Sequence, residues 1–128
     1  MMSGSSTTYI NRRINGIPYP RYKVRGNLQA PRQWTDDIVR QTKSWPLVRE
    51  PCVLKVTFLL PADKFSEDLP YGPDIDNLLK RLLDGLKQTV FSQAQGGDSS
   101  VVVLIATKTK VSPKKVPGVH VEIFPASF

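Results

Sequence analysis

Alternating and continuous apolar positions along the chain predict three β-strands. From Cys52 to Leu60, apolar side chains recur at every second position and alternate with Lys55 and Thr57, which predicts a strand with one buried face. Val119 to Ile123 alternates in the same way and predicts the last strand. The uninterrupted, β-branched run from Val101 to Ala106 predicts a strand that is buried on both faces.

Helical spacing of apolar residues predicts two helices. In residues 74–90 these residues recur every three or four positions and form one broad stripe. They are Ile75, Leu78, Leu79, Leu82, Leu83, Leu86 and Val90. Trp34 to Ser44 predicts a shorter helix, with Thr35 as its N-cap and with Asp36 and Asp37 in its first turn, where acidic side chains are favoured.

The N-terminal part of the chain predicts extended structure. Residues 9–17 alternate loosely and predict a first strand, and prolines keep the segment that follows extended. Arg21, Lys23 and Arg25 recur there at period two. An extended chain therefore places all three on one side.

The predicted elements follow one another as β–α–β–α–β–β, which indicates an α+β fold: a small mixed β-sheet with helices packed on it. A polar loop over residues 62–72 and a basic connection over residues 108–118 join neighbouring elements. A chain of 128 residues is the size of one domain, for which we expect the bounds 9–128. Residues 1–8 are rich in Ser, Thr and Gly and predict a disordered N-terminal tail.

Composition narrows the classes of function. The 18 Lys and Arg residues against 11 Asp and Glu residues give a formal net charge of +7, which favours a polyanionic partner, most often nucleic acid. No apolar run is long enough to cross a bilayer and no signal peptide is visible, so we expect a cytoplasmic protein without a membrane partner. The single cysteine, Cys52, and the single histidine, His120, exclude an internal disulfide and a Cys/His zinc site. If the protein is an enzyme, its catalytic groups are therefore expected to be carboxylates, lysines and a hard metal ion.

Acidic residues and a lysine gather around the start of the longer predicted helix. Asp74 and Asp76 stand two residues apart at a loop-to-helix junction, where both carboxylates can bind one magnesium ion together with water and substrate phosphate. Asp98, ahead of a predicted strand, is a third acid that the sheet could bring alongside. Lys80, one turn after Asp76, could stabilise charge that builds on a scissile phosphate.

A structural interpretation of the same residues is also open. Asp74 or Asp76 can cap the helix, and Asp76–Lys80 and Lys80–Asp84 are ordinary i,i+4 pairs that contribute roughly 0.2–0.5 kcal/mol each. The rotation of 100° per residue places Asp76, Lys80, Asp84 and Lys87 on one polar face beside the apolar stripe. Spacing alone is compatible with both interpretations.

Three motifs follow one another in this part of the chain: Asp74-Ile-Asp-Asn-Leu-Leu-Lys80, then Leu83-Asp-Gly-Leu86, then Asp98-Ser-Ser-Val101 with Lys108 beyond it. Together they resemble the RusA family of Holliday junction resolvases. The segment Gly16-Ile-Pro-Tyr-Pro-Arg21 is similar to that family's Gly-x-Pro-x-Pro-(Lys/Arg) segment. One departure concerns the third motif, because the family has a paired Asp-Asp where this chain has a single Asp98 after a longer, glycine-containing loop.

The resemblance implies a RusA-like fold and a homodimeric, magnesium-dependent endodeoxyribonuclease. Such an enzyme resolves four-way (Holliday) DNA junctions by paired cuts in DNA recombination and repair, in a bacterial or phage setting at the nucleoid. The resemblance further implies that Asp74, Asp76 and Asp98 are catalytic metal ligands and that Lys80 is the catalytic lysine. The residues expected to contact nucleic acid are Arg21, Lys23, Arg25, Lys80, Lys108 and Lys110.

Two other functions stay open on the sequence. Because Asp98 lacks its acidic neighbour, the chain could be a non-catalytic protein that binds DNA junctions on the same scaffold. It could also be a basic structural or interaction domain in which the acids only cap helices. The last alternative predicts no salt-dependent DNA binding.

Overall fold

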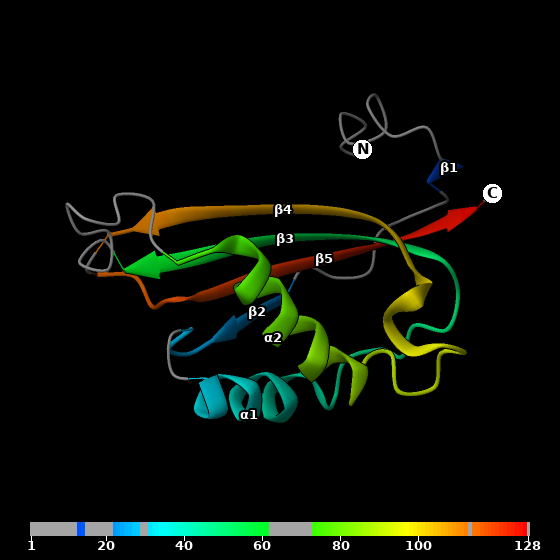
Figure 1. Cartoon of the computed structure of the whole chain (residues 1–128), viewed down its shortest axis with the longest axis horizontal. Helices are drawn as coiled ribbons and strands as arrows, with labels where there is room; N and C mark the ends of the chain where they lie inside the picture. The colour runs from blue at the N-terminus through cyan, green and yellow to red at the C-terminus, as the bar shows by residue number, and fades with distance from the viewer. Residues whose placement is uncertain (1–12, 15–21, 29–30, 62–72, 113, 128) are drawn as a thin grey trace.

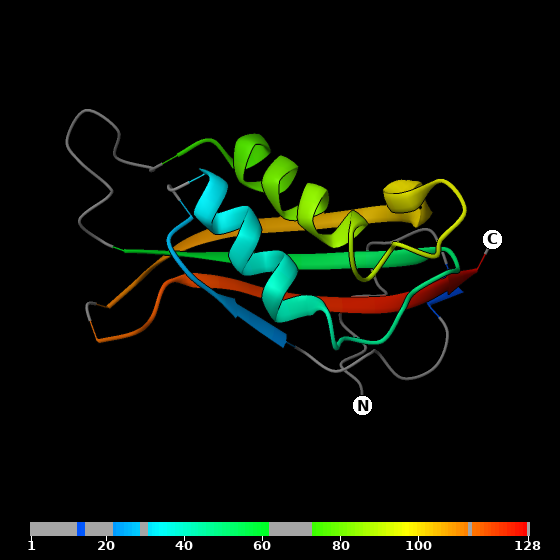
Figure 2. The same cartoon turned by 90° about the horizontal axis from the view of Figure 1, so that it is seen from below.

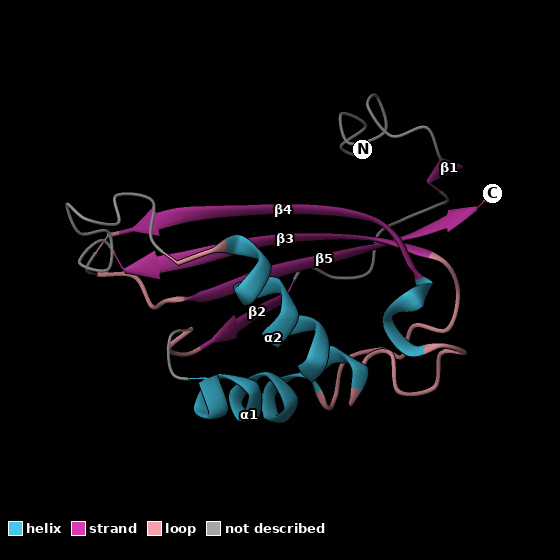
Figure 3. Cartoon of the chain, in the orientation of Figure 1, coloured by secondary structure: helices cyan, strands magenta, loops and turns pink. Residues whose placement is uncertain are grey.

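Five β-strands form a mixed sheet, and two α-helices cover one of its faces (Figure 1). The structure, a computed structural model, describes residues 13–14, 22–28, 31–61, 73–112 and 114–127. In chain order, its elements are β1 (Arg13–Ile14), β2 (Tyr22–Arg25), α1 (Pro31–Thr42), β3 (Cys52–Pro61), α2 (Ile75–Lys87), the 3-10 helix η3 (Gly97–Ser100), β4 (Val101–Val111) and β5 (Gly118–Ser127). Figure 3 separates these helices and strands by colour.

The strand order is β1-β5-β3-β4, and β2 also pairs with β5. β3 runs parallel to β4 and antiparallel to β5, while β1 and β2 are antiparallel to β5. Parallel neighbours cannot be joined by a hairpin, so α2 forms the crossover from β3 to β4. This arrangement confirms the predicted α+β fold with a mixed sheet and helices packed on it.

The core lies between the sheet and the two helices, which cross the same face of the sheet in Figure 2. Alternation along β3 and β5 directs one side of each strand toward the helices, as the sequence pattern predicts. The buried strand residues on that side are Cys52, Leu54, Val56, Phe58, Leu60, Val119, Val121 and Ile123. The buried helix residues that meet them include Trp34, Ile38, Leu78, Leu82 and Leu86.

Helices α1 and α2 approach each other closely at Gly85. A Cβ atom on this residue would lie 2.5 Å from Ile38 Cγ2, so only glycine permits this spacing. Nearby, the buried Thr42 hydroxyl donates to the Ile38 carbonyl (2.7 Å) and therefore accepts from the Thr89 hydroxyl (2.6 Å). These contacts fix how α2 sits against α1, and hence which of its faces meets solvent.

Both helices have different ends from those predicted. α1 begins at Pro31, so Thr35 is not its N-cap, and Asp36 and Asp37 lie beyond its first turn. The reason is that proline, which lacks an N–H group, is favoured at the first helical position and competes with the Thr35 signal. α2 ends at Lys87 rather than at residue 90.

The prediction that Val101–Ala106 is buried on both faces is wrong. β4 is an edge strand with β3 as its one neighbour in the described sheet, and the Leu104 side chain is 42% exposed. The strand also continues to Val111, so Lys108 and Lys110 lie on β4 and not in a connecting segment. The central, two-sided position belongs to β3, which pairs with both β4 and β5.

The other predictions concern the last strand, the N-terminal segments and the absence of a membrane span. The last strand is confirmed and is longer than predicted, because β5 continues to Ser127. Strands β1 and β2 lie within the two predicted N-terminal extended segments. The predicted tail over residues 1–8 lies outside the described residues, and so does Arg21. None of the helices in the described part of the chain has the length and apolar content needed to span a bilayer.

We expect the Cys52 thiol to react slowly in the folded protein. Burial raises the pKa of this thiol, and a hydrogen bond with Ser100 offsets only part of this effect. The net result is a shift from an ordinary value of 9.0 to about 11. At pH 8 the thiolate fraction is then about 100-fold smaller than in the unfolded chain, and the thiolate is the reactive species. Reaction with Ellman's reagent at pH 8, with and without denaturant, measures this difference.

The same shift predicts a change in stability at alkaline pH. The folded-state pKa is raised, so the neutral thiol favours folding fully below pH 9, and this contribution is lost as the pH rises toward about 11. We therefore expect the difference in unfolding free energy between the wild type and Cys52→Ala to shrink between pH 9 and pH 11. A difference that stays constant over that range would show that the thiol titrates normally.

Candidate active site

One face of α2 forms the wall of an open groove with a volume of ≈ 400 Å³. The opposite side is formed by η3 and β4, which lie next to α2 in Figures 1 and 2. The groove is lined by Asp76, Leu79, Lys80, Leu83, Asp84, Lys87, Asp98 and Leu104. Charged groups of both signs therefore share this groove with three leucines.

Helical spacing explains the order of charges in this groove. Asp76, Lys80, Asp84 and Lys87 follow at intervals of four, four and three residues, which places them on one side of α2. The sequence predicts this shared face, and all four residues line the groove. Lys87 and Asp84 are 3.5 Å apart, but both side chains are about half exposed, so this ion pair contributes little to stability.

The start of α2 presents two carboxylates. Asp74 occupies the N-cap position in an extended conformation, and its side chain makes no capping hydrogen bond within the described structure. The Asp76 Oδ1 atom accepts a hydrogen bond from the Asn77 backbone N–H (3.0 Å), which is one of the unpaired donors at the helix start. The capping interpretation thus fits Asp76 in part, and it does not fit Asp74.

The donor chemistry at this helix start suits magnesium. Magnesium prefers oxygen ligands and is usually held by one or two carboxylates together with water. Asp74 and Asp76 are exposed and supply two such carboxylates. Within the described residues, however, no group of three or more His, Cys, Asp or Glu side chains is gathered tightly enough to hold a metal ion.

Asp98 lies at the other end of the groove. It belongs to η3, whose first residue, Gly97, lies near the Lys87 side chain at the end of α2. A rise of 1.5 Å per residue puts Asp76 and Lys87 roughly 16 Å apart along the helix axis. The chain thus brings Asp76 and Asp98 to one groove but not to one point, and Asp74 is not among the groove-lining residues.

Three basic residues of the N-terminal extended segment are predicted to share one side. Two of them, Lys23 and Arg25, lie within the described residues. These residues flank Val24, which is fully buried, while Lys23 is half-buried and Arg25 is exposed. Arg25 pairs with Gly118, and the Gly26 N–H donates to the Pro117 carbonyl (3.2 Å). The end of β2 therefore lies beside the turn that carries two exposed lysines, Lys114 and Lys115.

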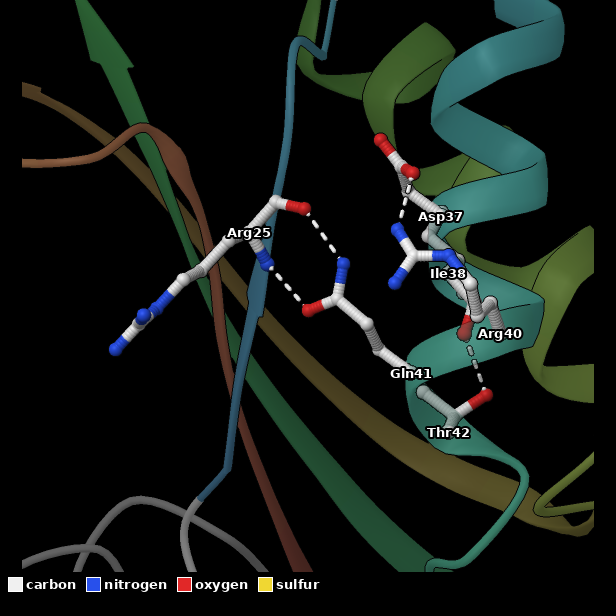
Figure 4. A network of polar contacts seen from close by, with 6 residues as sticks. All are labelled: Arg25, Asp37, Ile38, Arg40, Gln41 and Thr42. Atoms are coloured by element: carbon white, nitrogen blue, oxygen red, sulfur yellow. Dashed lines mark hydrogen bonds and ion pairs between the residues drawn. The ribbon is translucent and has the colours of Figure 1, made fainter.

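Gln41 fixes the backbone at Arg25 (Figure 4). Its Oε1 atom accepts from the Arg25 N–H (2.9 Å), and its Nε2 atom donates to the Arg25 carbonyl (2.7 Å). The Arg25 guanidinium extends away from α1 in this view. A side chain of α1 thus holds the strand while the arginine is presented outward.

Lys108 has a different setting from the exposed lysines. It is half-buried on β4, and its Nζ atom donates a hydrogen bond of 2.6 Å to the Pro73 carbonyl, directly before Asp74. Its ammonium group is therefore engaged inside the protein.

Sequence reasoning missed three features of this region. They are η3, the Gln41–Arg25 pairing and the Lys108–Pro73 hydrogen bond. The Gly96–Gly97 pair is the local signal for the first, since both glycines adopt positive φ angles that favour this residue. The other two join residues that are distant in sequence, and no local pattern signals them.

Comparison with known proteins identifies one family. The sequence profile of endodeoxyribonuclease RusA matches residues 8–124. A search among curated proteins gives no match.

Proposed function

We propose that the chain, which belongs to the endodeoxyribonuclease RusA family, is a magnesium-dependent, structure-selective endonuclease. It resolves four-way DNA junctions by paired phosphodiester hydrolysis. We place this activity in DNA recombination and repair. The observation that carries the proposal is the start of α2, where Asp74, Asp76 and Lys80 lie within two turns of one another. These residues combine metal-binding and phosphate-binding groups beside an open groove.

In this proposal, Asp74 and Asp76 hold the magnesium ion. When bound, magnesium supplies an activated water and offsets the negative charge that develops on the phosphate. Lys80, which is exposed one turn beyond Asp76, donates hydrogen bonds to a non-bridging phosphate oxygen as its charge grows. Asp74 has no capping role to give up when it binds a ligand.

The basic residues support DNA as the substrate. Lys23, Arg25, Lys110, Lys114 and Lys115 contribute to a net charge of +7, and the Arg25 guanidinium points outward. Each phosphate that these residues neutralise steepens the log–log dependence of affinity on salt by about 0.9. A four-way junction has approximate two-fold symmetry and needs two symmetric cuts, so we propose that the active species is a homodimer.

A second function, junction binding without cutting, is favoured by one observation. Asp98 belongs to η3, which lies beside the end of α2 (Figure 1), and no three acidic groups converge within the described residues. A chain in which the third acid is misplaced would retain its basic surface and bind DNA without hydrolysing it.

A cleavage assay on a labelled four-way junction and a matched linear duplex tests the proposal. We expect paired nicks in the junction alone, with magnesium present, and none with EDTA. Binding without cutting under all conditions would favour the second function, and the absence of salt-dependent binding would contradict both.

The variant Asp98→Asn belongs in the same assay. Loss of cutting in this variant would make Asp98 a metal ligand of the active species, despite its place at the far end of the groove. Cutting that survives would assign the third ligand to another residue and leave the enzyme assignment intact.

A further inference from the structure

We propose that Lys108 is a positioning residue, which holds the start of α2 and thereby fixes Asp74 and Asp76 for the reaction. This inference rests on the function proposed above. It differs from the sequence-based expectation that Lys108 contacts nucleic acid, because its ammonium group is already committed to the Pro73 carbonyl at 2.6 Å.

The strand register explains how Lys108 reaches this carbonyl. Lys108 pairs with Phe58 on the parallel neighbour β3, and Phe58 is fully buried in the core beneath the helices. Paired residues of parallel strands face the same side of the sheet, so Lys108 also points toward α2. From this side of β4 its charged end reaches the chain at Pro73.

The segment held by Lys108 leads directly into the candidate metal ligands. Asp74 follows Pro73, and the Asp74 carbonyl accepts the Leu78 N–H (3.3 Å) as α2 begins. The Asp74 side chain does not cap the helix in the described structure, so it does not itself fix this segment. The charge-assisted hydrogen bond from Lys108 on β4 ties Pro73 to the sheet.

Helix electrostatics argue against a purely stabilising role for this lysine. The N-terminal end of a helix carries partial positive charge, and a cation beside it is unfavourable. Lys108 is nevertheless half-buried there, next to a chain segment that carries Asp74 and Asp76. The position suits a group that orders two carboxylates more than one that stabilises a helix.

The test compares Lys108→Met, Lys108→Arg and a control, Lys55→Met. Lys55 is a half-buried lysine on β3 that lies on the other side of the sheet, opposite Glu122. Junction cleavage gives kcat and KM, and hydrogen exchange measured by mass spectrometry follows the Leu78 amide and those just after it, the first that bond to the backbone within α2. Lys108→Gln replaces the methionine variant if that variant does not fold.

We expect Lys108→Met to lower kcat about 10- to 100-fold with KM changed less than about 2-fold, because small misplacements of reacting groups cost rates of this order. Exchange at the amides from Leu78 onward should speed up in the same variant. Lys108→Arg should recover much of kcat, since arginine can donate to the same carbonyl, and Lys55→Met should change neither measurement.

Three results would overturn the inference. They are an unchanged kcat in Lys108→Met, a rise in KM alone, which would make Lys108 a phosphate contact, and a fall in kcat with unchanged hydrogen exchange. A wild type that does not cut junctions would refute the proposed function instead. The exchange comparison would then still decide whether Lys108 holds the helix start.

Discussion

Asp76→Asn should abolish junction cutting, with a rate at least about 100-fold below the wild type, while junction binding is kept or strengthened. The substitution removes one carboxylate from the start of α2, and with it one of the two groups proposed to hold magnesium. It also removes a negative charge that repels the DNA phosphates. Single-turnover cleavage and a gel-shift titration on the same junction measure the two effects separately.

Asp36→Asn is the matched control for this experiment. Asp36 is an exposed acid on α1, outside the groove, so its replacement makes the same change in net charge. We expect wild-type cutting from this variant. Loss of binding by a correctly folded Asp76→Asn protein would contradict the role assigned to Asp76, and so would cutting at the wild-type rate.

Leu82→Ala should lower the free energy of unfolding by about 2–5 kcal/mol. Leu82 has no exposed surface and lies on the face of α2 that packs into the core opposite the groove. Truncation removes buried apolar atoms and leaves a cavity. The close contact between Gly85 and Ile38 prevents the two helices from moving together to close it. Urea denaturation followed by circular dichroism measures the change.

Leu47→Ala serves as the control for this substitution. The Leu47 side chain is 45% exposed in the segment between α1 and β3, so its truncation should cost less than about 1 kcal/mol. Equal losses for Leu82→Ala and Leu47→Ala would mean that the buried face of α2 is assigned incorrectly.

Elements with a clear local period were predictable from the sequence. The alternation along β3 and the helical spacing of the leucines in α2 depend only on residues within each element, and the structure confirms both. The start of α1 was not predicted correctly, because Pro31 and Thr35 both carry helix-start signals. The edge position of β4 was also missed, since a short apolar run has the same composition in a central strand and in an edge strand.

The candidate site also contains features that the sequence predicts and features that it does not. Helical geometry alone predicts that Asp76, Lys80, Asp84 and Lys87 share one face, and they line one groove. The place of Asp98 depends instead on the path of the chain between α2 and β4. The Lys108 contact depends on the register of β3 and β4, which no pattern within a single strand reveals.

The Gln41–Arg25 pairing also bears on how the protein behaves at high concentration. β2 pairs with β5, and an outer strand of this kind tends to recruit strands from other molecules through its outward-facing main-chain groups. The Gln41 amide occupies both such groups of Arg25, as a neighbouring strand would. This end of β2 is therefore closed to strand addition, and α1 blocks edge-to-edge pairing at this position while a basic side chain stays exposed.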